Sequence, residues 1–352
     1  MTPEDTSNLM CIGSMVLGIV VLVIIVIIWL VKMSKKDRKF PDPTTTTVGI
    51  PTLMNKSLRN YYIKSSYNSC AAGEFTNDFV SMAALTNAIK QGCRLLDFEI
   101  YDIDGEPVVA VSNSVKYTTK SCYNSLPLSE VFATVKNDAF TSSNRGDPLF
   151  LSLRIKCVHP ELFAKIGTLL QNYFSERLLG GEYSYEYGGK NIALVPLNTL
   201  LGKVIIMADL SNKKLQFSPL MEFVNLGTNS AFNRILRYTE VAHDPPMDLS
   251  QFVLKNLTMC VPDLVGSASN YDSSVAMNQG IQMVAMCYQS ADKNLAQYNT
   301  IFSRYAFVEK TADLQYTPTV VEDAPDLPSV LNYGNILTSV RAGDTVQNIT
   351  VA

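Results

Sequence analysis

The sequence has little of three features that often reveal a function: histidine, net charge and paired cysteines. It contains only two histidines, His159 and His243, so chemistry that relies on an imidazole base has few candidates. Its net charge is -3, from 29 basic and 32 acidic residues, which argues against nucleic acid as a partner because phosphate binding draws on surplus lysine and arginine. The seven cysteines are scattered without a CxxC pair, which predicts neither a zinc site nor a disulfide framework and fits a reducing compartment.

What the chain has instead is one long apolar run, Cys11–Val31, which carries no charge. A helix needs about 20 apolar residues to cross a bilayer, so this run predicts a transmembrane helix. A cleaved signal peptide would have basic residues before a shorter run, but the preceding segment contains Glu4 and Asp5 and no base. A buried core helix is the remaining alternative, and the length and lack of polarity of the run speak against it.

Basic residues follow the apolar run, and Trp29 is placed near the same end as an interface anchor. By the positive-inside rule, residues 1–10 are expected to be translocated, while the large C-terminal part stays on the cytosolic side of the membrane. Residues 32–50 are expected to be a juxtamembrane segment and linker, with the basic residues Lys32, Lys35, Lys36, Arg38 and Lys39.

Strand-like and helix-like stretches alternate in the next part of the chain, 51–308. The expected strands are short β-branched or aromatic runs: Tyr61–Ser66, Leu95–Tyr101, Pro107–Val111, Leu149–Ile155, Val204–Ala208, Phe223–Leu226 and Ile281–Cys287. The expected helices have apolar residues at spacings of three and four: Phe79–Lys90, Leu128–Asn137, Glu161–Phe174 and Asp292–Phe302. Such alternation over about 250 residues predicts an α/β fold, and a barrel of the triosephosphate isomerase (TIM) kind is a natural single domain of this size.

The last part of the chain, 309–352, changes in character. Glu322–Pro328 interrupts regular structure, and the residues after it have short apolar patches without a long period. We expect an extended C-terminal arm that adds a strand to a neighbour or wraps it, with disorder as the alternative.

The stretch that most suggests chemistry is Gly92–Ser114. Asp97 and Glu99 are two positions apart on an expected strand, so both side chains point to the same side of the sheet and could share one cation. The stretch ends in Ser-Asn-Ser, where a hydrolase would need a base. It is therefore either a working site or the remnant of one.

Several segments resemble eukaryotic phosphoinositide-specific phospholipase C. YYIKSSYN at 61–68, GCRLLDFE at 92–99 and EPVV at 106–109 are similar to its X region, which reads approximately YFI-SSHNT, GCR-x-x-E-x-D and EP-x-x-x-HGHT. SASNY at 267–271 and GIQMVAMCYQ at 280–289 are similar to its Y region. The order and spacing agree over roughly 54–307, and the resemblance implies a TIM-like barrel whose site lies at the C-terminal ends of the strands.

The resemblance also implies that the catalytic histidines are lost. The family cleaves a phosphodiester with two histidines, which correspond to Tyr67 and Asn113 in this chain. A phenol titrates at about 10 and an amide does not titrate near neutrality, so neither can act as the acid or base. His159 and His243 fall on neither of these positions.

The family's calcium ligands correspond to Asn68, Asp97, Glu99 and Arg154, the last in the segment LSLR at 151–154 where the family has a glutamate. A guanidinium in a calcium shell repels the ion. We therefore expect that no calcium or other cofactor is bound, and that Arg154 pairs with the two carboxylates in place of the metal.

The positions that would hold the substrate are altered as well. Met207 and Asp209 occupy the places of the family's phosphate-binding lysines, and Met259 and Val261 those of an arginine and a tyrosine. Without these cations a polyanionic headgroup has little to bind. Ser269 and Tyr271, in the SASNY segment, are retained from the family, and we expect them to serve packing.

Two functions are compatible with this pattern. The first is a non-catalytic, membrane-anchored structural or interaction protein, whose partners are the bilayer, through residues 11–31, and other structural proteins of an assembly. Such a membrane-tied, degenerate enzyme fold would suit a minor capsid protein of a large DNA virus that links an internal virion membrane to the capsid; this step rests on the combination of features and on no motif. The second is a divergent phosphoinositide phosphodiesterase or phosphoinositide-binding module that uses unusual residues.

Overall fold

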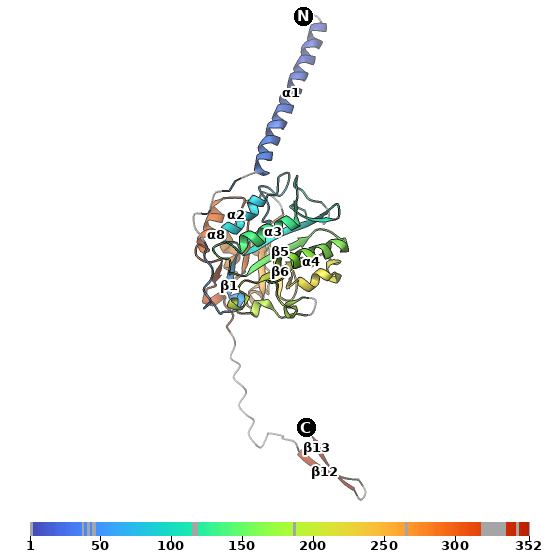
Figure 1. Ribbon diagram of the computed structural model, residues 1–352, viewed down its shortest axis with the longest axis vertical. Helices are drawn as coiled ribbons and strands as arrows, with labels where there is room; N and C mark the ends of the chain where they lie inside the picture. Colours follow the sequence, from blue (N-terminus) through green and yellow to red (C-terminus); the bar gives the residue numbers. More distant parts are fainter. Residues whose placement is uncertain are drawn as a thin grey trace. The chain divides into compact units, whose positions relative to one another are not determined.

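The computed structural model of the protein describes residues 3–36, 39–40, 43, 47–114, 119–185, 188–264, 267–317, 336–342 and 345–351. The chain divides into two units, Met1–Tyr316 and Thr317–Ala352, and each is described by itself. The first unit contains the N-terminal helix α1 (Pro3–Lys36) and an α/β barrel (Figure 1).

Eight parallel strands form a nearly closed barrel wall in the order β7-β6-β5-β2-β1-β10-β9-β8. Their bounds are β1 Tyr61–Ser66, β2 Leu95–Ile103, β5 Leu149–Ile155, β6 Val204–Ala208, β7 Leu226–Gly227, β8 Asn233–Arg237, β9 Leu257–Val261 and β10 Met283–Met286. Three further strands lie off this path: β3 (Glu106–Ala110) pairs with β2 and with β4 (Leu126–Pro127), and β11 (Phe307–Glu309) pairs with β1. The predicted TIM-like barrel is thus confirmed.

The described part of the wall has one open seam, between β7 and β8. Unpaired strand N–H groups are costly when they are shielded from water, so a seam needs other acceptors. The N–H of Ile235 donates to Asn229 Oδ1 at 3.2 Å, and the N–H of Arg237 donates to Glu240 Oε2 at 3.1 Å. Side chains therefore replace the missing neighbour strand along this edge of β8.

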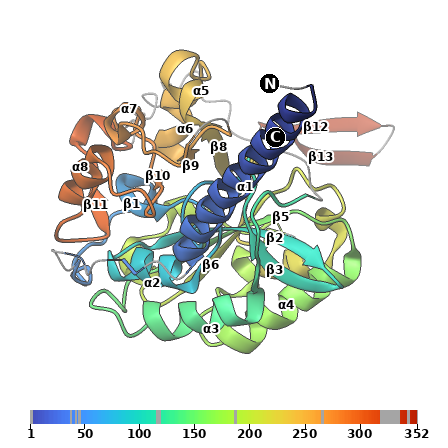
Figure 2. The ribbon, with the colours of Figure 1, turned by 90° about the horizontal axis from the view of Figure 1, so that it is seen from above.

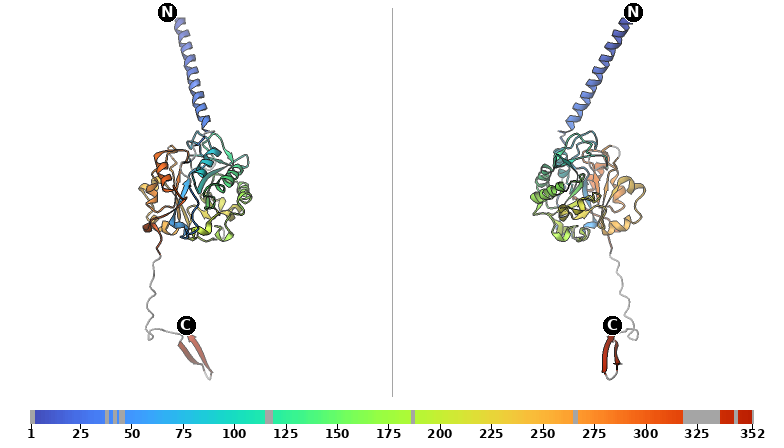
Figure 3. Two further views of the ribbon diagram at one scale, coloured as in Figure 1. Left: turned by 60° about the vertical axis from the view of Figure 1, so that its left-hand side comes forward. Right: turned by 90° about the vertical axis from the view of Figure 1, so that its right-hand side faces the viewer.

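Helices surround the strands, as Figure 2 shows for the view from above. Their bounds are α2 Met82–Lys90, α3 Leu128–Ala139, α4 Pro160–Phe174, α5 Tyr238–His243, α6 Leu249–Lys255, α7 Ser273–Met277 and α8 Lys293–Ile301. Short 3-10 turns complete the connections at Leu58–Asn60, Gly181–Tyr183, Ile192–Leu194, Leu197–Leu200, Leu215–Phe217, Pro219–Phe223 and Ala312–Leu314. Figure 3 shows α3 and α4 (green) and the helices of the later half (orange) on opposite sides of the barrel.

The sequence patterns agree with the structure best in the first half of the barrel. The strands expected at Tyr61–Ser66, Leu149–Ile155 and Val204–Ala208 have those bounds in the structure. The strand expected at Phe223–Leu226 is wrong. Phe223 ends the 3-10 turn Pro219–Phe223, Val224 and Asn225 are loop, and only Leu226 belongs to β7. Strands β8 and β9 and helices α5 to α7 were not expected.

Helix α1 contains the apolar run. Its segment Ile12–Val31 has 20 residues and a mean hydropathy of 3.3, and none of it is buried against the rest of the protein. By length and composition it is able to cross a membrane. A signal sequence near the N-terminus would pass the same test. Arg38, one of the basic residues expected after the span, lies outside the described residues.

The second unit contains an antiparallel hairpin of β12 (Ile336–Ala342) and β13 (Thr345–Val351), with a register from Ile336 opposite Val351 to Ala342 opposite Thr345. The expected interruption at Glu322–Pro328 lies outside the described residues.

Candidate functional site

The strands place the candidate residues at one end of the barrel. Tyr67 and Asn68 directly follow β1, and Asp97 and Glu99 lie within β2. Arg154 lies on β5, directly opposite Glu99 in the parallel register, while Ser152 lies opposite Asp97. Because side chains alternate along a strand, these residues of β2 and β5 face the same side of the sheet.

The Arg154 guanidinium lies among Asn68, Asp97 and Glu99, which the family resemblance places at a calcium site, and it donates to four side chains. Nε donates to Asp97 Oδ1 at 3.0 Å, Nη1 to Glu99 Oε1 at 2.6 Å and to the Tyr67 hydroxyl at 3.3 Å, and Nη2 to Asp97 Oδ2 at 2.6 Å and to Asn68 Oδ1 at 2.7 Å. A guanidinium has five N–H donors, so every donor of Arg154 has an acceptor. The fork of Arg154 is bidentate on Asp97, the strongest geometry for such a pair.

The cluster is shielded from water. Asp97 and Glu99 are 0% exposed, Tyr67 and Asn68 are 2% exposed, and Arg154 is 8% exposed. Burial by itself lowers the pKa of the Arg154 guanidinium, but Asp97, Tyr67 and Glu99 together raise that pKa well above its ordinary value. The arginine is therefore a permanent internal cation for the two carboxylates.

Both carboxylates accept further hydrogen bonds. Asp97 Oδ1 accepts from the Ser152 hydroxyl at 2.9 Å, and Asp97 Oδ2 accepts from the backbone N–H of Asn68 at 3.1 Å. Glu99 Oε2 accepts from the Tyr101 hydroxyl at 2.8 Å. Calcium needs six to eight oxygen ligands, and here the oxygens already accept hydrogen bonds around a cation, so the residues do not fit calcium. Within the described residues, no group of three His, Cys, Asp or Glu side chains is arranged to hold a metal.

Tyr67 is the residue that the family resemblance places at the first histidine. Its ring packs edge-on against Phe75 at a centroid distance of 5.5 Å, and the Arg154 guanidinium carbon lies 4.7 Å from the ring centroid. Burial raises the pKa of the Tyr67 phenol, although Arg154 and Arg237 oppose this effect. The phenol stays protonated at neutral pH and cannot act as a base.

Asn113, at the position of the second histidine, is not part of this cluster. It lies on the loop after β3, and its side chain is exposed. An amide at an exposed loop position gives the site neither a base nor an acid.

Of the expected substrate positions, Met207 and Tyr271 pack within the fold, whereas Asp209 and Ser269 accept hydrogen bonds, so packing does not account for Ser269. Met207 is buried in β6, and Asp209 Oδ1 accepts from the backbone N–H of Ser211 and from the Thr228 hydroxyl. The Tyr271 hydroxyl donates to the backbone oxygens of Cys260 and Ala285, and its ring stacks on Tyr238 at 4.3 Å. Ser269 is exposed and accepts a hydrogen bond from Ser267.

Three contributors to the site were not expected from the sequence. Tyr101 and Ser152 lie two positions from Glu99 and Arg154 on the same strands, so the alternation of strand side chains could have identified them. Arg237 donates to the Tyr67 hydroxyl at 3.4 Å and to the Pro262 carbonyl at 2.6 Å. It ends β8, which showed no recognised strand pattern, so no sequence signal pointed to it.

Comparison with known proteins agrees with the family resemblance and with the fold. Residues 54–209 match the sequence model of the phosphatidylinositol-specific phospholipase C, X domain. The chain is 30% identical over 120 residues to a 1-phosphatidylinositol 4,5-bisphosphate phosphodiesterase of Dictyostelium discoideum. The matched region covers 34% of this chain and 14% of that protein. It is 31% identical over 105 residues to the 1-phosphatidylinositol 4,5-bisphosphate phosphodiesterase 1 of Saccharomyces cerevisiae. That match covers 30% of this chain and 11% of the yeast protein. This chain thus spans only a small part of these curated relatives.

Solved structures show the same fold. The S. officinalis PLC21 structure superposes with a TM-score of 0.62 at 18% identity, over 75% of this chain and 38% of that one. The L. pealei PLC21 structure gives a TM-score of 0.62 at 18% identity, over 77% and 39%. Fold and site together define a phospholipase-C-like TIM barrel. Within that class, the chain resembles phosphoinositide-specific phospholipase C.

Proposed function

We propose that this chain is a non-catalytic, membrane-anchored phospholipase-C-like protein with a structural or interaction role. The observation that carries the proposal is the Arg154 guanidinium, whose five donors are all taken by Asp97, Glu99, Asn68 and Tyr67. A phosphodiesterase of this family would need the same oxygens for calcium.

Acid–base chemistry is the second support. Tyr67 and Asn113 provide no group that titrates near neutrality, and general acid–base catalysis contributes about 10²- to 10⁴-fold to such reactions. The buried cluster also leaves little room for a headgroup, since Asp97 and Glu99 are 0% exposed. Without acid–base catalysis and without room for the headgroup, we expect the barrel to show no useful turnover.

Membrane anchoring rests on α1. The segment Ile12–Val31 is long enough for a bilayer core, and the basic residues that follow it favour a cytosolic barrel. The partners that we propose are the bilayer and structural proteins of a larger assembly. A place in a virion between an internal membrane and a capsid stays a prediction, and detection of the chain in purified particles tests it.

The rival function is a divergent phosphodiesterase, favoured by the names of the curated relatives. Incubation of the full-length chain with vesicles containing 1-phosphatidylinositol 4,5-bisphosphate, with and without calcium, separates the two functions. We expect no release of the phosphorylated headgroup under either condition. Turnover that disappears in Tyr67→Phe or Asn113→Ala would overturn the non-catalytic proposal.

A further inference from the structure

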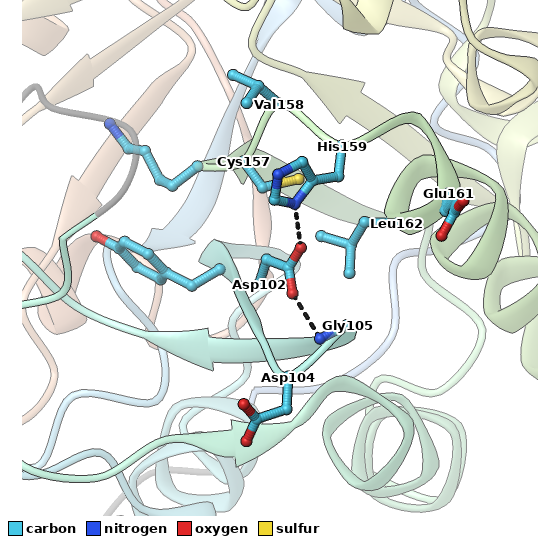
Figure 4. A pocket seen from close by; sticks show the side chains of 10 residues that line it. Asp102, Asp104, Gly105, Cys157, Val158, His159, Glu161 and Leu162 are labelled. Atoms are coloured by element: carbon cyan, nitrogen blue, oxygen red, sulfur yellow. Dashed lines mark hydrogen bonds and ion pairs between the residues drawn. The ribbon is translucent and has the colours of Figure 1, made fainter.

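Two cavities open next to each other between α4 and the β2–β3 hairpin. The lining of the first includes Tyr101, whose hydroxyl donates to Glu99 of the Arg154 cluster. The first, called the acidic cavity, has a volume of about 480 Å³ and is lined by Asp102, Asp104, Glu161 and neighbouring residues (Figure 4). The second, called the apolar cavity, has a volume of about 470 Å³ and is lined mainly by Pro107, Val108, Pro127, Ala164 and Leu169.

The hairpin and α4 hold each other in place between the two cavities. Asp104 and Gly105 form the hairpin tip, with positive φ of 53° and 79°, as a tight two-residue turn requires. Lys165 Nζ of α4 donates to Gly105 O at 2.7 Å and to Glu106 Oε1 at 2.5 Å. This contact forms the ridge between the cavities, so both are built on ordered elements.

The acidic cavity carries three carboxylates against the one ammonium of Lys156 when His159 is neutral. Asp102 is already satisfied, because Oδ1 accepts from the Gly105 N–H at 2.9 Å and Oδ2 lies 2.5 Å from His159 Nδ1, as the dashed lines in Figure 4 show. Asp104 and Glu161 are exposed, and neither has an ion pair within the described part of the chain. These two carboxylates are available to a cation from outside.

The distance between the cavities determines how long a ligand must be to reach both of them. Helix α4 lines the acidic cavity with Glu161 and Leu162 and the apolar cavity with Ala164, Lys165, Thr168 and Leu169. The two contributions are centred about five residues apart, or roughly 7.5 Å along the helix axis. An extended peptide advances about 3.3 Å per residue, so two positions span this distance.

We propose that the acidic and apolar cavities together bind an extended segment of a partner protein, with a lysine or arginine in the acidic cavity and a bulky apolar residue two positions away in the apolar cavity. This inference rests on the proposed interaction role and names the chemistry of the partner. Charge complementarity selects a basic segment and disfavours an anionic lipid surface, which the same carboxylates repel.

Fluorescence anisotropy with labelled, end-blocked hexapeptides and the full-length chain in detergent tests the proposal. The panel holds a peptide with arginine and leucine two positions apart, a peptide with glutamate for arginine, a peptide with serine for leucine, and a peptide with the two residues adjacent. We expect the first peptide to bind at least tenfold more tightly than each of the others. Equal affinity across the panel, or no binding at all, would overturn the proposal.

Substitutions then locate the binding site. Asp104→Lys combined with Glu161→Lys reverses the charge of the acidic cavity, and Thr168→Trp fills the apolar cavity; all three side chains are exposed, so the fold should persist. Each variant is expected to weaken the first peptide at least tenfold, while the exposed control Glu176→Lys leaves it unchanged. Unchanged binding in folded variants would contradict the assignment.

Other occupants give different patterns. If no peptide binds, but the chain self-associates with rising concentration and Thr168→Trp abolishes this association, the occupant is a second copy of the chain and not a partner segment. Binding to anionic vesicles that Thr168→Trp abolishes would replace it by lipid. Headgroup release in the phosphodiesterase assay would overturn the non-catalytic proposal alone, so the two failures are distinguishable.

Discussion

At the scale of single residues, Arg154 solves the problem that two fully buried carboxylates pose. Ionised carboxylates lose several kcal/mol of hydration on burial and need a cation in ideal geometry. A calcium ion or a guanidinium can fill this need, and the planar fork of arginine matches carboxylates on two neighbouring strands. We therefore propose that the arginine on β5 makes a structural ion cluster of the residues that the resemblance places at a metal site.

Arg154→Met should destabilise the fold strongly, because it leaves Asp97 and Glu99 buried without a counter-charge. Breaking a buried ion pair in this way costs about 3 to 5 kcal/mol. Chemical denaturation measures the free energy of unfolding, and the exposed control Arg145→Met should stay within about 0.5 kcal/mol of the wild type. A loss for Arg154→Met no larger than that of the control would refute a structural role for the cluster.

Lys310 should make stability depend on pH. Its ammonium is 2% exposed, has no hydrogen-bond partner among the described residues, and burial lowers its pKa from 10.5 to about 7. The unfolded chain keeps the proton up to about pH 10.5 and the folded chain only up to about pH 7, so this residue raises the free energy of unfolding as the pH rises between these values.

Lys310→Met removes that contribution. Relative to the variant, the wild type should gain on the order of 3 to 5 kcal/mol between pH 7 and pH 10.5, and the variant should be the more stable protein at pH 6. Urea denaturation across this range measures the difference, with the exposed Lys255→Met as a control. Parallel pH profiles for wild type and Lys310→Met would show that the ammonium is not buried unpaired.

At the scale of elements, the sequence is most informative where one pattern determines the structure. β5 and β6 are short, mainly apolar runs that are buried throughout, so their composition alone marks them. β1 is also buried throughout, but Lys64, Ser65 and Ser66 follow its aromatic start. β8, with the sequence Asn-Arg-Ile-Leu-Arg, borders the open seam and is only partly buried, so it lacks this pattern. Arg237 was missed for the same reason.

Two kinds of sequence reasoning predicted different parts of the candidate site. Strand alternation placed Asp97 and Glu99 on one face, and the family resemblance brought in Tyr67, Asn68 and Arg154, which are far apart in the chain. The structure brings these five together. Asn113 stays outside the cluster, because its place depends on a loop whose course no residue pattern determines.

Gly92 tests how tightly α2 and β2 are joined. It has a φ of +88°, and a Cβ there would lie 2.4 Å from the Thr47 hydroxyl oxygen, which itself contacts the carbonyls of Gln91 and Phe302. Gly105 has a similar φ of +79° but open space around it, so Gly105→Ala is a matched control.

In both alanine variants the left-handed backbone should lower the free energy of unfolding by about 1 kcal/mol. In Gly92→Ala the clash with Thr47 should lower it by roughly 1 to 3 kcal/mol more. Thermal and urea denaturation of the two variants measure the difference. If Gly105→Ala is at least as destabilising as Gly92→Ala, the contact with Thr47 is not tight.

At the scale of the whole molecule, function depends on which side of a membrane the barrel lies. We expect that the basic residues after the span hold the barrel on the cytosolic side. Replacing Lys32, Lys35, Lys36, Arg38 and Lys39 by glutamine, with lysines added before residue 10, should invert a large share of the molecules. Protease protection of a C-terminal tag in microsomes measures this share. A protected tag in the wild type would contradict the proposed orientation.

The replacement of calcium by Arg154 is tested most directly by calorimetric titration of calcium into the full-length chain and into Arg154→Glu. The variant restores the family's carboxylate beside Asn68, Asp97 and Glu99. We predict no heat of calcium binding in the micromolar to millimolar range for the wild type, and binding with a rise in thermal stability for the variant. Micromolar calcium binding by the wild type that is lost in Asp97→Asn would contradict the central claim.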